Sequence, residues 1–226
     1  MTICHATDTS ESRHMNSGSS FVHIVDDDPS VRTAVGRVLR AAGYQVTLHE
    51  SASHLLQNLP AAAERGCILL DVQMPGLNGP QLQEVLGKMN FALPIIFLTG
   101  HGDIPMTVRA IKSGAEDFLS KPAPKRVLLE AVERALKRYD AMNELNTQLS
   151  SFRESYSALT PREREVFLLV ARGKLNKQIG HELGTSERTI KAHRHNIMQK
   201  FNVKSIAGLV SIAEKLQLLT GPVNRQ

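Results

Sequence analysis

Short apolar runs alternate with segments of helical spacing from residue 21 to about residue 120. We expect five buried strands, at Phe21–Val25, Tyr44–Leu48, Cys67–Leu70, Pro94–Leu98 and Asp117–Ser120. Between the strands, apolar residues recur three and four positions apart, as they do on the core-facing side of a helix. Strands that alternate with helices predict a parallel sheet with helices on both faces. The front of the chain is therefore predicted to be an α/β doubly wound (flavodoxin-like) domain with a five-stranded parallel sheet.

A long segment without glycine or proline follows this domain, from Lys125 to Thr160. Its apolar residues keep spacings of three and four, which predicts one helix of roughly 50 Å at 1.5 Å per residue. An apolar stripe of that length needs a partner, either the front domain, the back of the chain or a second copy of itself. The alternative is two helices with a polar break near Asn143–Ser151.

The residues from 159 to 219 predict four short helices with sharp boundaries. Thr160, Asn176, Ser186 and Ser205 are the expected N-caps. Only Gly184, Thr185 and Ser186 separate the second helix from the third, which is the spacing of a helix-turn-helix. The back of the chain is therefore predicted to be a small all-α domain.

The two halves differ in charge. Residues 157–226 hold 12 Lys and Arg against 5 Asp and Glu, whereas residues 1–156 hold 15 against 17. A near-neutral front joined to a basic back indicates that only the back meets a polyanion such as nucleic acid. The alternative is an ordinary basic surface.

Composition excludes several other classes of protein. No apolar run is long enough to span a membrane, and residues 1–20 lack the apolar centre of a signal peptide. The two cysteines, Cys4 and Cys67, make neither a disulfide framework nor a zinc site. We therefore expect a cytoplasmic protein with a disordered tail at residues 1–20.

Polar side chains follow four of the predicted strands. They are Asp26, Asp27, Asp28, Asp71, Thr99 and Lys121. In a doubly wound sheet the carboxyl ends of the strands converge on one rim, so these groups should meet there. Converging carboxylates repel one another unless a cation joins them, and oxygen ligands favour Mg²⁺. With Asp71 as nucleophile, such a rim could form an acyl phosphate.

The front half closely resembles the receiver domain of bacterial two-component response regulators, through VHIVDDD (22–28), ILLDVQMPGLNG (68–79), PIIFLTGHGD (94–103) and AEDFLSKP (115–122). The resemblance implies that a partner histidine kinase phosphorylates Asp71. It implies that Asp27 ligates Mg²⁺ directly, that Asp26 does so through water, and that the backbone carbonyl of Gln73 completes the protein ligands. Gln73 and His101 would tune the lifetime of the acyl phosphate.

The same resemblance assigns a switch beside the phosphoacceptor. Thr99 and Lys121 would grip the phosphoryl group, and Phe118 would change rotamer together with Thr99. The peptide bond between Lys121 and Pro122 would be cis. We expect phosphorylation to make the face around Met106–Ser113 self-complementary, so that receivers pair and the protein becomes a homodimer. The alternative is that the unphosphorylated receiver masks the DNA-binding helix.

The helix from Glu187 to Phe201 has one apolar stripe and one basic stripe when its residues are placed at 100° intervals. Lys191, Ala192 and His195 lie on the basic side with Arg188. A recognition helix needs such a side, thin enough to enter the major groove of DNA. The alternative is a solvated basic face on an ordinary amphipathic helix.

The run LTPREREVFLLVARGKLNKQIGHELGTSERTIKAHRHNIMQKFNVKSIAGL (159–209) closely resembles the LuxR-type helix-turn-helix domain of the FixJ/NarL class. The resemblance places Lys191, Ala192 and His195 at groove-facing positions. It implies that Lys177, Thr189 and Lys200 contact phosphates, which position the helix without reading bases. Gly180 lies in mid-helix where relatives commonly have Ala, at a cost of about 1 kcal/mol.

These resemblances divide the chain into a receiver at residues 21–124, a helical linker at 125–157, a LuxR-type domain at 158–221 and a tail at 222–226. The predicted function is a phosphorylation-controlled transcriptional regulator, with a histidine kinase, promoter DNA and RNA polymerase as partners and no membrane. It would not be an enzyme beyond slow self-dephosphorylation. The alternatives are an HAD-like aspartyl-phosphate hydrolase, which would need an acidic residue where Gln73 stands, and a phosphorylation-independent regulator.

Overall fold

The computed structural model describes residues 20–61, 64–100 and 115–219. Most of the predicted N-terminal tail, the tail at 222–226, His101 and the face around Met106–Ser113 lie outside these ranges. In the part of the chain that is described, no helix is both long and apolar enough to cross a membrane.

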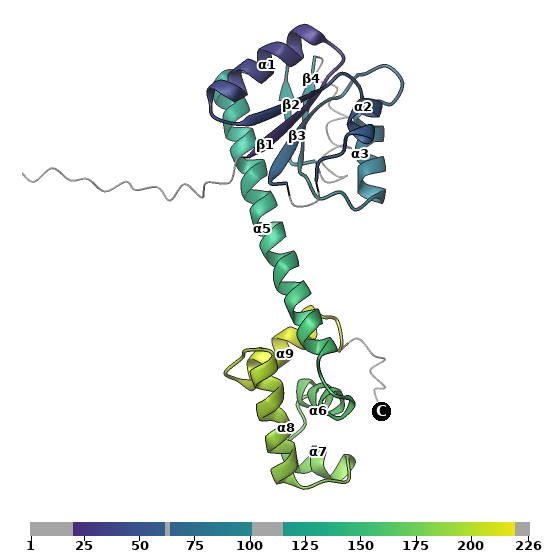
Figure 1. Ribbon diagram of the computed structural model, residues 1–226, viewed down its shortest axis with the longest axis vertical. Helices are drawn as coiled ribbons and strands as arrows, with labels where there is room; N and C mark the ends of the chain where they lie inside the picture. Colours follow the sequence, from purple (N-terminus) through teal and green to yellow (C-terminus); the bar gives the residue numbers. More distant parts are fainter. Residues whose placement is uncertain (1–19, 62–63, 101–114, 220–226) are drawn as a thin grey trace, which may run out of the picture. The chain divides into compact units, whose positions relative to one another are not determined.

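The five predicted strands form one parallel sheet (Figure 1). Its strand order is β2-β1-β3-β4-β5. The strands are β1 (Phe21–Val25), β2 (Gln45–His49), β3 (Gly66–Asp71), β4 (Ile95–Thr99) and β5 (Asp117–Ser120). Each begins within one residue of its predicted start. The order reverses direction beside β1, so the crevice beyond the ends of β1 and β3 is where a ligand is expected.

Helices cover both faces of the sheet. α1 (Pro29–Ala41) and the first half of α5 (Lys125–Ser157) pack on one face, where Leu39 and Leu128 join a core with the strands. α2 (Ala52–Gln57) and α3 (Gly79–Lys88) pack on the other. The predicted doubly wound α/β fold is confirmed.

α1 begins at Asp28, which is its N-cap. The Asp28 carboxylate accepts hydrogen bonds from the backbone N–H groups of Ser30 at 2.7 Å and Val31 at 3.4 Å. Pro29 occupies the first helical position, where no N–H is needed. Of the three successive aspartates after β1, Asp28 therefore serves the helix and leaves Asp26 and Asp27 for the rim of the sheet.

α5 is one continuous helix, so the alternative of two helices with a break near Asn143–Ser151 is wrong. Its first half contributes buried side chains to the receiver core, and Tyr139 is the last of them. Asp140 forms a bidentate ion pair with Arg65, at 2.7 Å from both Nε and Nη2. The chain divides into two compact units between Ala141 and Met142, within this helix.

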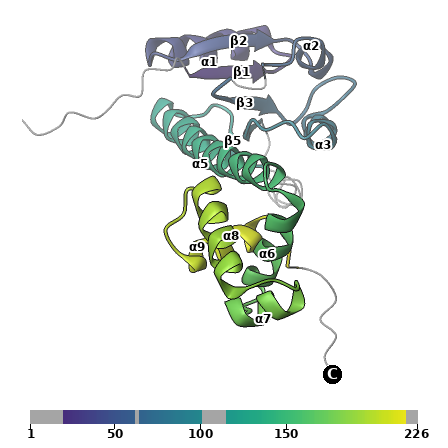
Figure 2. The same cartoon turned by 60° about the horizontal axis from the view of Figure 1, so that its bottom comes forward.

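The second unit contains α6 (Pro161–Ala171), α7 (Asn176–Glu182), α8 (Glu187–Lys200) and α9 (Ile206–Lys215), which surround their own core (Figure 2). Phe167 stacks on Phe201 in this core, with ring centroids 5.2 Å apart. Phe152 and Tyr156, from the end of α5, pack against the same cluster. The predicted four-helix arrangement is confirmed.

The expected N-caps Thr160, Ser186 and Ser205 are confirmed, since each side chain accepts a backbone hydrogen bond from its helix. The prediction for Asn176 is wrong. Leu175 is the N-cap of α7, and its backbone N–H donates to the side chain of Gln178 at 2.8 Å. The Asn176 side chain instead accepts a hydrogen bond from Arg194 of α8, a tertiary contact that local sequence does not reveal.

Candidate functional site

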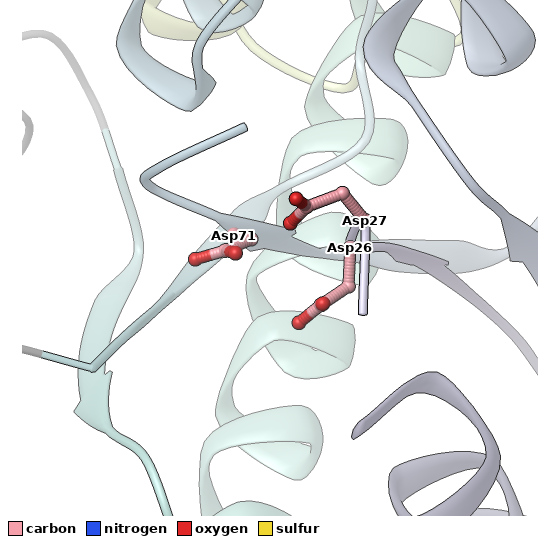
Figure 3. A group of neighbouring side chains, drawn as sticks. All are labelled: Asp26, Asp27 and Asp71. Carbon is pink, nitrogen blue, oxygen red and sulfur yellow. The ribbon is translucent and has the colours of Figure 1, made fainter. Parts of the chain in front are cut away.

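Three carboxylates converge at the carboxyl ends of β1 and β3 (Figure 3). Asp26 and Asp27 follow β1, and Asp71 is the last residue of β3. Each offers an oxygen within 4.8 Å of the others. Asp26 and Asp71 are buried and Asp27 is exposed, so the cluster forms the floor and rim of a site open to solvent.

Lys121 joins two of these carboxylates. Its Nζ lies 2.6 Å from Oδ2 of Asp26 and 2.9 Å from Oδ2 of Asp71. The residue follows β5, and its backbone N–H donates to the carbonyl of Thr99 at 2.6 Å, which places it beside the end of β4. The Lys121–Pro122 peptide bond is cis, as predicted.

The electrostatics of the site show an excess of negative charge. Burial raises the pKa of Asp71 and Asp26 adds to the rise, although Lys121 opposes it. For Lys121, burial alone would lower the pKa of the ammonium, but Asp26 and Asp71 together outweigh burial and raise it. Burial together with Asp26 therefore outweighs Lys121 at Asp71, whereas the two carboxylates outweigh burial at Lys121, and both groups hold their protons more tightly than usual.

These residues fit a hard divalent cation. The cluster supplies oxygen atoms only, which is the donor set that Mg²⁺ prefers. A cation would also offset the burial and, to a smaller extent, the Asp26 charge that raise the pKa of Asp71. The structure places Gln73 beside the cluster, with its backbone N–H 3.3 Å from Oδ1 of Asp71.

Thr99 and Phe118 lie on neighbouring strands near the site. Thr99 ends β4 and is 4% exposed. Phe118 pairs in register with Phe97, two residues before Thr99, and the two rings lie 5.9 Å apart. Phe118 is half-buried and leaves the sheet on the same face as Thr99.

Two residues near the site were not predicted. Gly79 begins α3, and a Cβ there would lie 2.4 Å from the backbone carbonyl oxygen of Asp71, so only glycine lets α3 start this close to β3. Arg32 of α1 donates from Nη1 to the backbone carbonyl of Asp26. The glycine-rich turn GLNG was a visible signal for Gly79, but Arg32 has no local signal.

The predicted DNA-contacting residues lie on α7 and α8. Lys177, Arg188, Thr189, Lys191, Ala192 and His195 are exposed. Lys191 pairs with Glu187 one turn earlier at 3.2 Å, and the Thr189 hydroxyl lies 2.8 Å from that of Ser186. Ile190 and Ile197 on the opposite stripe are buried, which agrees with the predicted division of the helix into two faces.

Lys200 differs from the other predicted phosphate contacts. Its Nζ lies 2.7 Å from Oε2 of Glu163 and 3.1 Å from the backbone carbonyl of Ala158. The Glu163 side chain is 6% exposed, and that of Lys200 is 34% exposed. Lys200 is therefore paired at the surface of the module with a buried carboxylate, a partner that the sequence did not reveal.

Comparisons with known proteins agree with both halves of the chain. Residues 22–133 match the model of the response regulator receiver domain, and residues 157–213 match that of bacterial regulatory proteins of the luxR family. The response regulator protein TmoT of Ectopseudomonas mendocina is 43% identical, over 91% of this chain and 93% of the relative. The transcriptional regulatory protein FixJ of Rhizobium meliloti is 38% identical, over 85% of this chain and 94% of FixJ.

A solved structure extends this similarity to the fold. The response regulator StyR superposes with a TM-score of 0.75 and 45% identity, over 88% of this chain and all of StyR. The fold and the acidic site thus define a receiver joined to a LuxR-type DNA-binding domain. The chain belongs to the family of two-component response regulators that act in transcription, and the comparisons favour this family over the hydrolase alternative.

Proposed function

We propose that Asp71 is the phosphoacceptor of this response regulator. Asp71 ends β3 in the crevice where the strand order reverses, and its carboxylate oxygen Oδ2 lies 2.9 Å from the Lys121 ammonium. This observation carries the proposal, because a carboxylate beside a fixed cation can attack phosphorus while the cation holds the transferred oxygens. In the proposed step, an Asp71 oxygen forms a bond to phosphorus and the phosphorus–nitrogen bond of a kinase phosphohistidine breaks.

Asp26, Asp27 and Asp71 would hold Mg²⁺ through their carboxylates, together with the backbone carbonyl of Gln73. The metal would supply positive charge that neutralises the phosphoryl oxygens. Lys121 would form an ion pair with the phosphoryl group, and the Thr99 hydroxyl would donate a hydrogen bond to it. Gln73 stands where related hydrolases have a second acid, so we expect self-dephosphorylation to be slow.

The exposed stripe of α8 is the proposed DNA-reading surface. Lys191, Ala192 and His195 would face the major groove, while Arg188, Thr189 and Lys177 would contact the groove edge and phosphates. One such module makes a small interface with DNA, so tight binding calls for two copies on two half-sites. We infer that phosphorylation promotes a homodimer that binds promoter DNA in the cytoplasm and contacts RNA polymerase.

The proposal is tested by incubating the purified chain with acetyl phosphate, with and without Mg²⁺. We expect Mg²⁺-dependent addition of one phosphoryl group, detected by intact mass, and no addition in Asp71→Asn. Phosphorylated protein should sediment as a dimer and bind promoter DNA more tightly than unmodified protein. Equal DNA affinity in labelled, unlabelled and Asp71→Asn protein would instead favour a phosphorylation-independent regulator.

A further inference from the structure

The position of the Asp27 carboxylate in the acidic site depends on the loop that carries it. Asp27 is the exposed member of the cluster, and its oxygen lies within 4.8 Å of those of Asp26 and Asp71. Among the described residues, Lys121 pairs with Asp26 and Asp71 but not with Asp27. The feature that aims the Asp27 side chain at its neighbours must therefore lie in the backbone between β1 and α1.

Two peptide groups flank Asp27, and a side chain holds each of them. Nη1 of Arg32 donates a hydrogen bond to the backbone carbonyl of Asp26 at 2.5 Å. The backbone N–H of Asp28 donates to the carboxylate oxygen Oδ1 of Asp26 at 2.9 Å. Because a peptide group is planar, a bond to its C=O or its N–H restrains the orientation of the whole group. With both planes restrained, the side chain of Asp27 leaves the backbone in one direction.

Arg32 is itself fixed relative to this loop. It lies half-buried near the N-terminus of α1, and its backbone N–H donates to the carbonyl of Asp28 at 3.0 Å. Asp28 is also the N-cap of the same helix. The helix dipole does not favour a cation in this place. The contact with the Asp26 carbonyl is therefore what stabilises the guanidinium here.

We propose that Arg32 is a positioning residue for Mg²⁺ at the acidic site. By orienting the peptide group before Asp27, it directs that carboxylate toward Asp26 and Asp71 in advance of the ion. Less conformational freedom is then lost when the ion binds, which increases affinity. The inference rests on the proposed function of the cluster and adds to it a residue that contacts no phosphoryl group or metal.

The charge of Arg32 and its hydrogen bond act on metal affinity with opposite signs. A guanidinium beside the cluster repels a cation, so if charge alone mattered, Arg32→Ala would bind the ion more tightly. If Arg32 positions Asp27, Arg32→Ala should bind the ion about 10–100-fold more weakly, as is typical for residues that orient metal ligands. Arg32→Lys separates the two further. It keeps the charge but lacks the planar fork, and it should also bind more weakly than the wild type.

The test measures binding of Mn²⁺, which takes the same oxygen ligands, to the full-length chain. Electron paramagnetic resonance reports the free ion, and Mg²⁺ is added as the competitor. We expect the wild type to bind one Mn²⁺ that Mg²⁺ displaces, and both Arg32 variants to need higher Mn²⁺ concentrations. Arg37→Ala is the matched control, since Arg37 is an exposed arginine on the same helix, and it should bind Mn²⁺ as the wild type does.

A second measurement follows the loop without metal. In ¹⁵N relaxation of the metal-free protein, the order parameter of the Asp27 amide should fall from about 0.85 toward about 0.6 in Arg32→Ala, while that of Leu70 in β3 is unchanged. Circular dichroism confirms folding, and if Arg32→Ala is unfolded, Arg32→Lys carries both measurements. Wild-type or tighter Mn²⁺ binding in the Arg32 variants, or an unchanged Asp27 amide, would overturn the role of Arg32 alone. Absence of Mn²⁺ binding in the wild type would instead refute the metal site, and the role of Arg32 with it.

Discussion

The Lys200 ammonium at the end of α8 lies 2.7 Å from the Glu163 carboxylate in the first turn of α6. Glu163 also accepts a hydrogen bond from the backbone N–H of Thr160 at 2.8 Å, closing a capping box. The pair therefore joins the start of the DNA-binding module to the recognition helix. Because Glu163 is buried, the pairing matters for stability as well as for the placement of α8.

Replacing Lys200 with Ala should lower the free energy of unfolding of this module by roughly 1–3 kcal/mol, since a buried carboxylate loses its partner. The hydrogen bond from Lys200 lowers the pKa of Glu163 against the opposing effect of burial. A lowered pKa contributes stability that is present above the unfolded pKa of about 4.3 and is lost as the pH falls through the folded value. Urea unfolding at a series of pH values from about 7 downward should show the deficit shrinking as the pH falls below about 4. A deficit that stays the same at every pH would contradict the pairing.

Lys191→Ala should relax discrimination between bases, because Lys191 lies on the exposed stripe of α8 that faces the groove in our proposal.

Lys177→Ala should weaken binding to all sequences alike and reduce the salt slope by about 1, as expected for a phosphate contact. Lys200→Ala should likewise weaken binding to all sequences alike, when it is compared with the wild type at equal concentrations of folded protein. Fluorescence anisotropy on specific and scrambled duplexes over a range of salt would measure both. A change of sequence preference in Lys200→Ala would show that the orientation of α8 is wrong.

Mg²⁺ should stabilise the receiver, because the cation binds the folded carboxylate cluster and not the unfolded chain. At 100 times the dissociation constant the gain is about 2.7 kcal/mol, measured by thermal or urea unfolding. Asp27→Asn should abolish this gain without harming the fold, since Asp27 is exposed. Asp28→Asn is the matched control, because Asn also caps a helix and Asp28 lies outside the cluster. An equal response to Mg²⁺ in both variants would contradict the site.

Gly180→Ala should destabilise the DNA-binding module by roughly 1–3 kcal/mol, although alanine favours helices. A Cβ at Gly180 would lie 2.8 Å from the backbone carbonyl of Thr185, in the turn between α7 and α8. Gly87→Ala provides the comparison, since a Cβ there meets nothing within 4 Å and should stabilise α3 by about 0.5–1 kcal/mol. Chemical denaturation of the two variants should give shifts of opposite sign.

Cys67 should be unreactive in the folded protein. The residue is fully buried in β3, and burial raises the pKa of its thiol to about 12. In Cys4→Ser protein, which retains only this cysteine, a thiol reagent such as dithionitrobenzoate should react at the rate of unfolding. Reaction within seconds under native conditions would contradict the burial of β3.

Sequence patterns predicted the strands and the convergence of Asp26, Asp71 and Lys121, because buried parallel strands are continuous apolar runs and their carboxyl ends meet at one rim. The N-caps at Thr160, Ser186 and Ser205 were also predictable, since capping is a local interaction.

The features that were missed depend on residues far apart in the sequence. The Asn176 side chain accepts a hydrogen bond from Arg194, and Lys200 is paired with Glu163, 37 positions earlier. The contact between His23 and His49 likewise depends on the register of β1 against β2. The need for glycine at position 180 followed only once the Thr185 carbonyl was placed beside it.

The continuous helix α5 contributes side chains to two hydrophobic cores. This limits where the chain can be divided into stable fragments. Cutting at residue 158 would remove Phe152 and Tyr156 from the core of α6–α9, although they precede the matched luxR segment by only a few residues. Ending a receiver fragment at residue 124 would remove α5, which covers one face of the sheet. A receiver fragment should therefore end after Asp140, and a DNA-binding fragment should start before Phe152, so that each keeps its full stability. Residues 141–151 are the place to divide the chain.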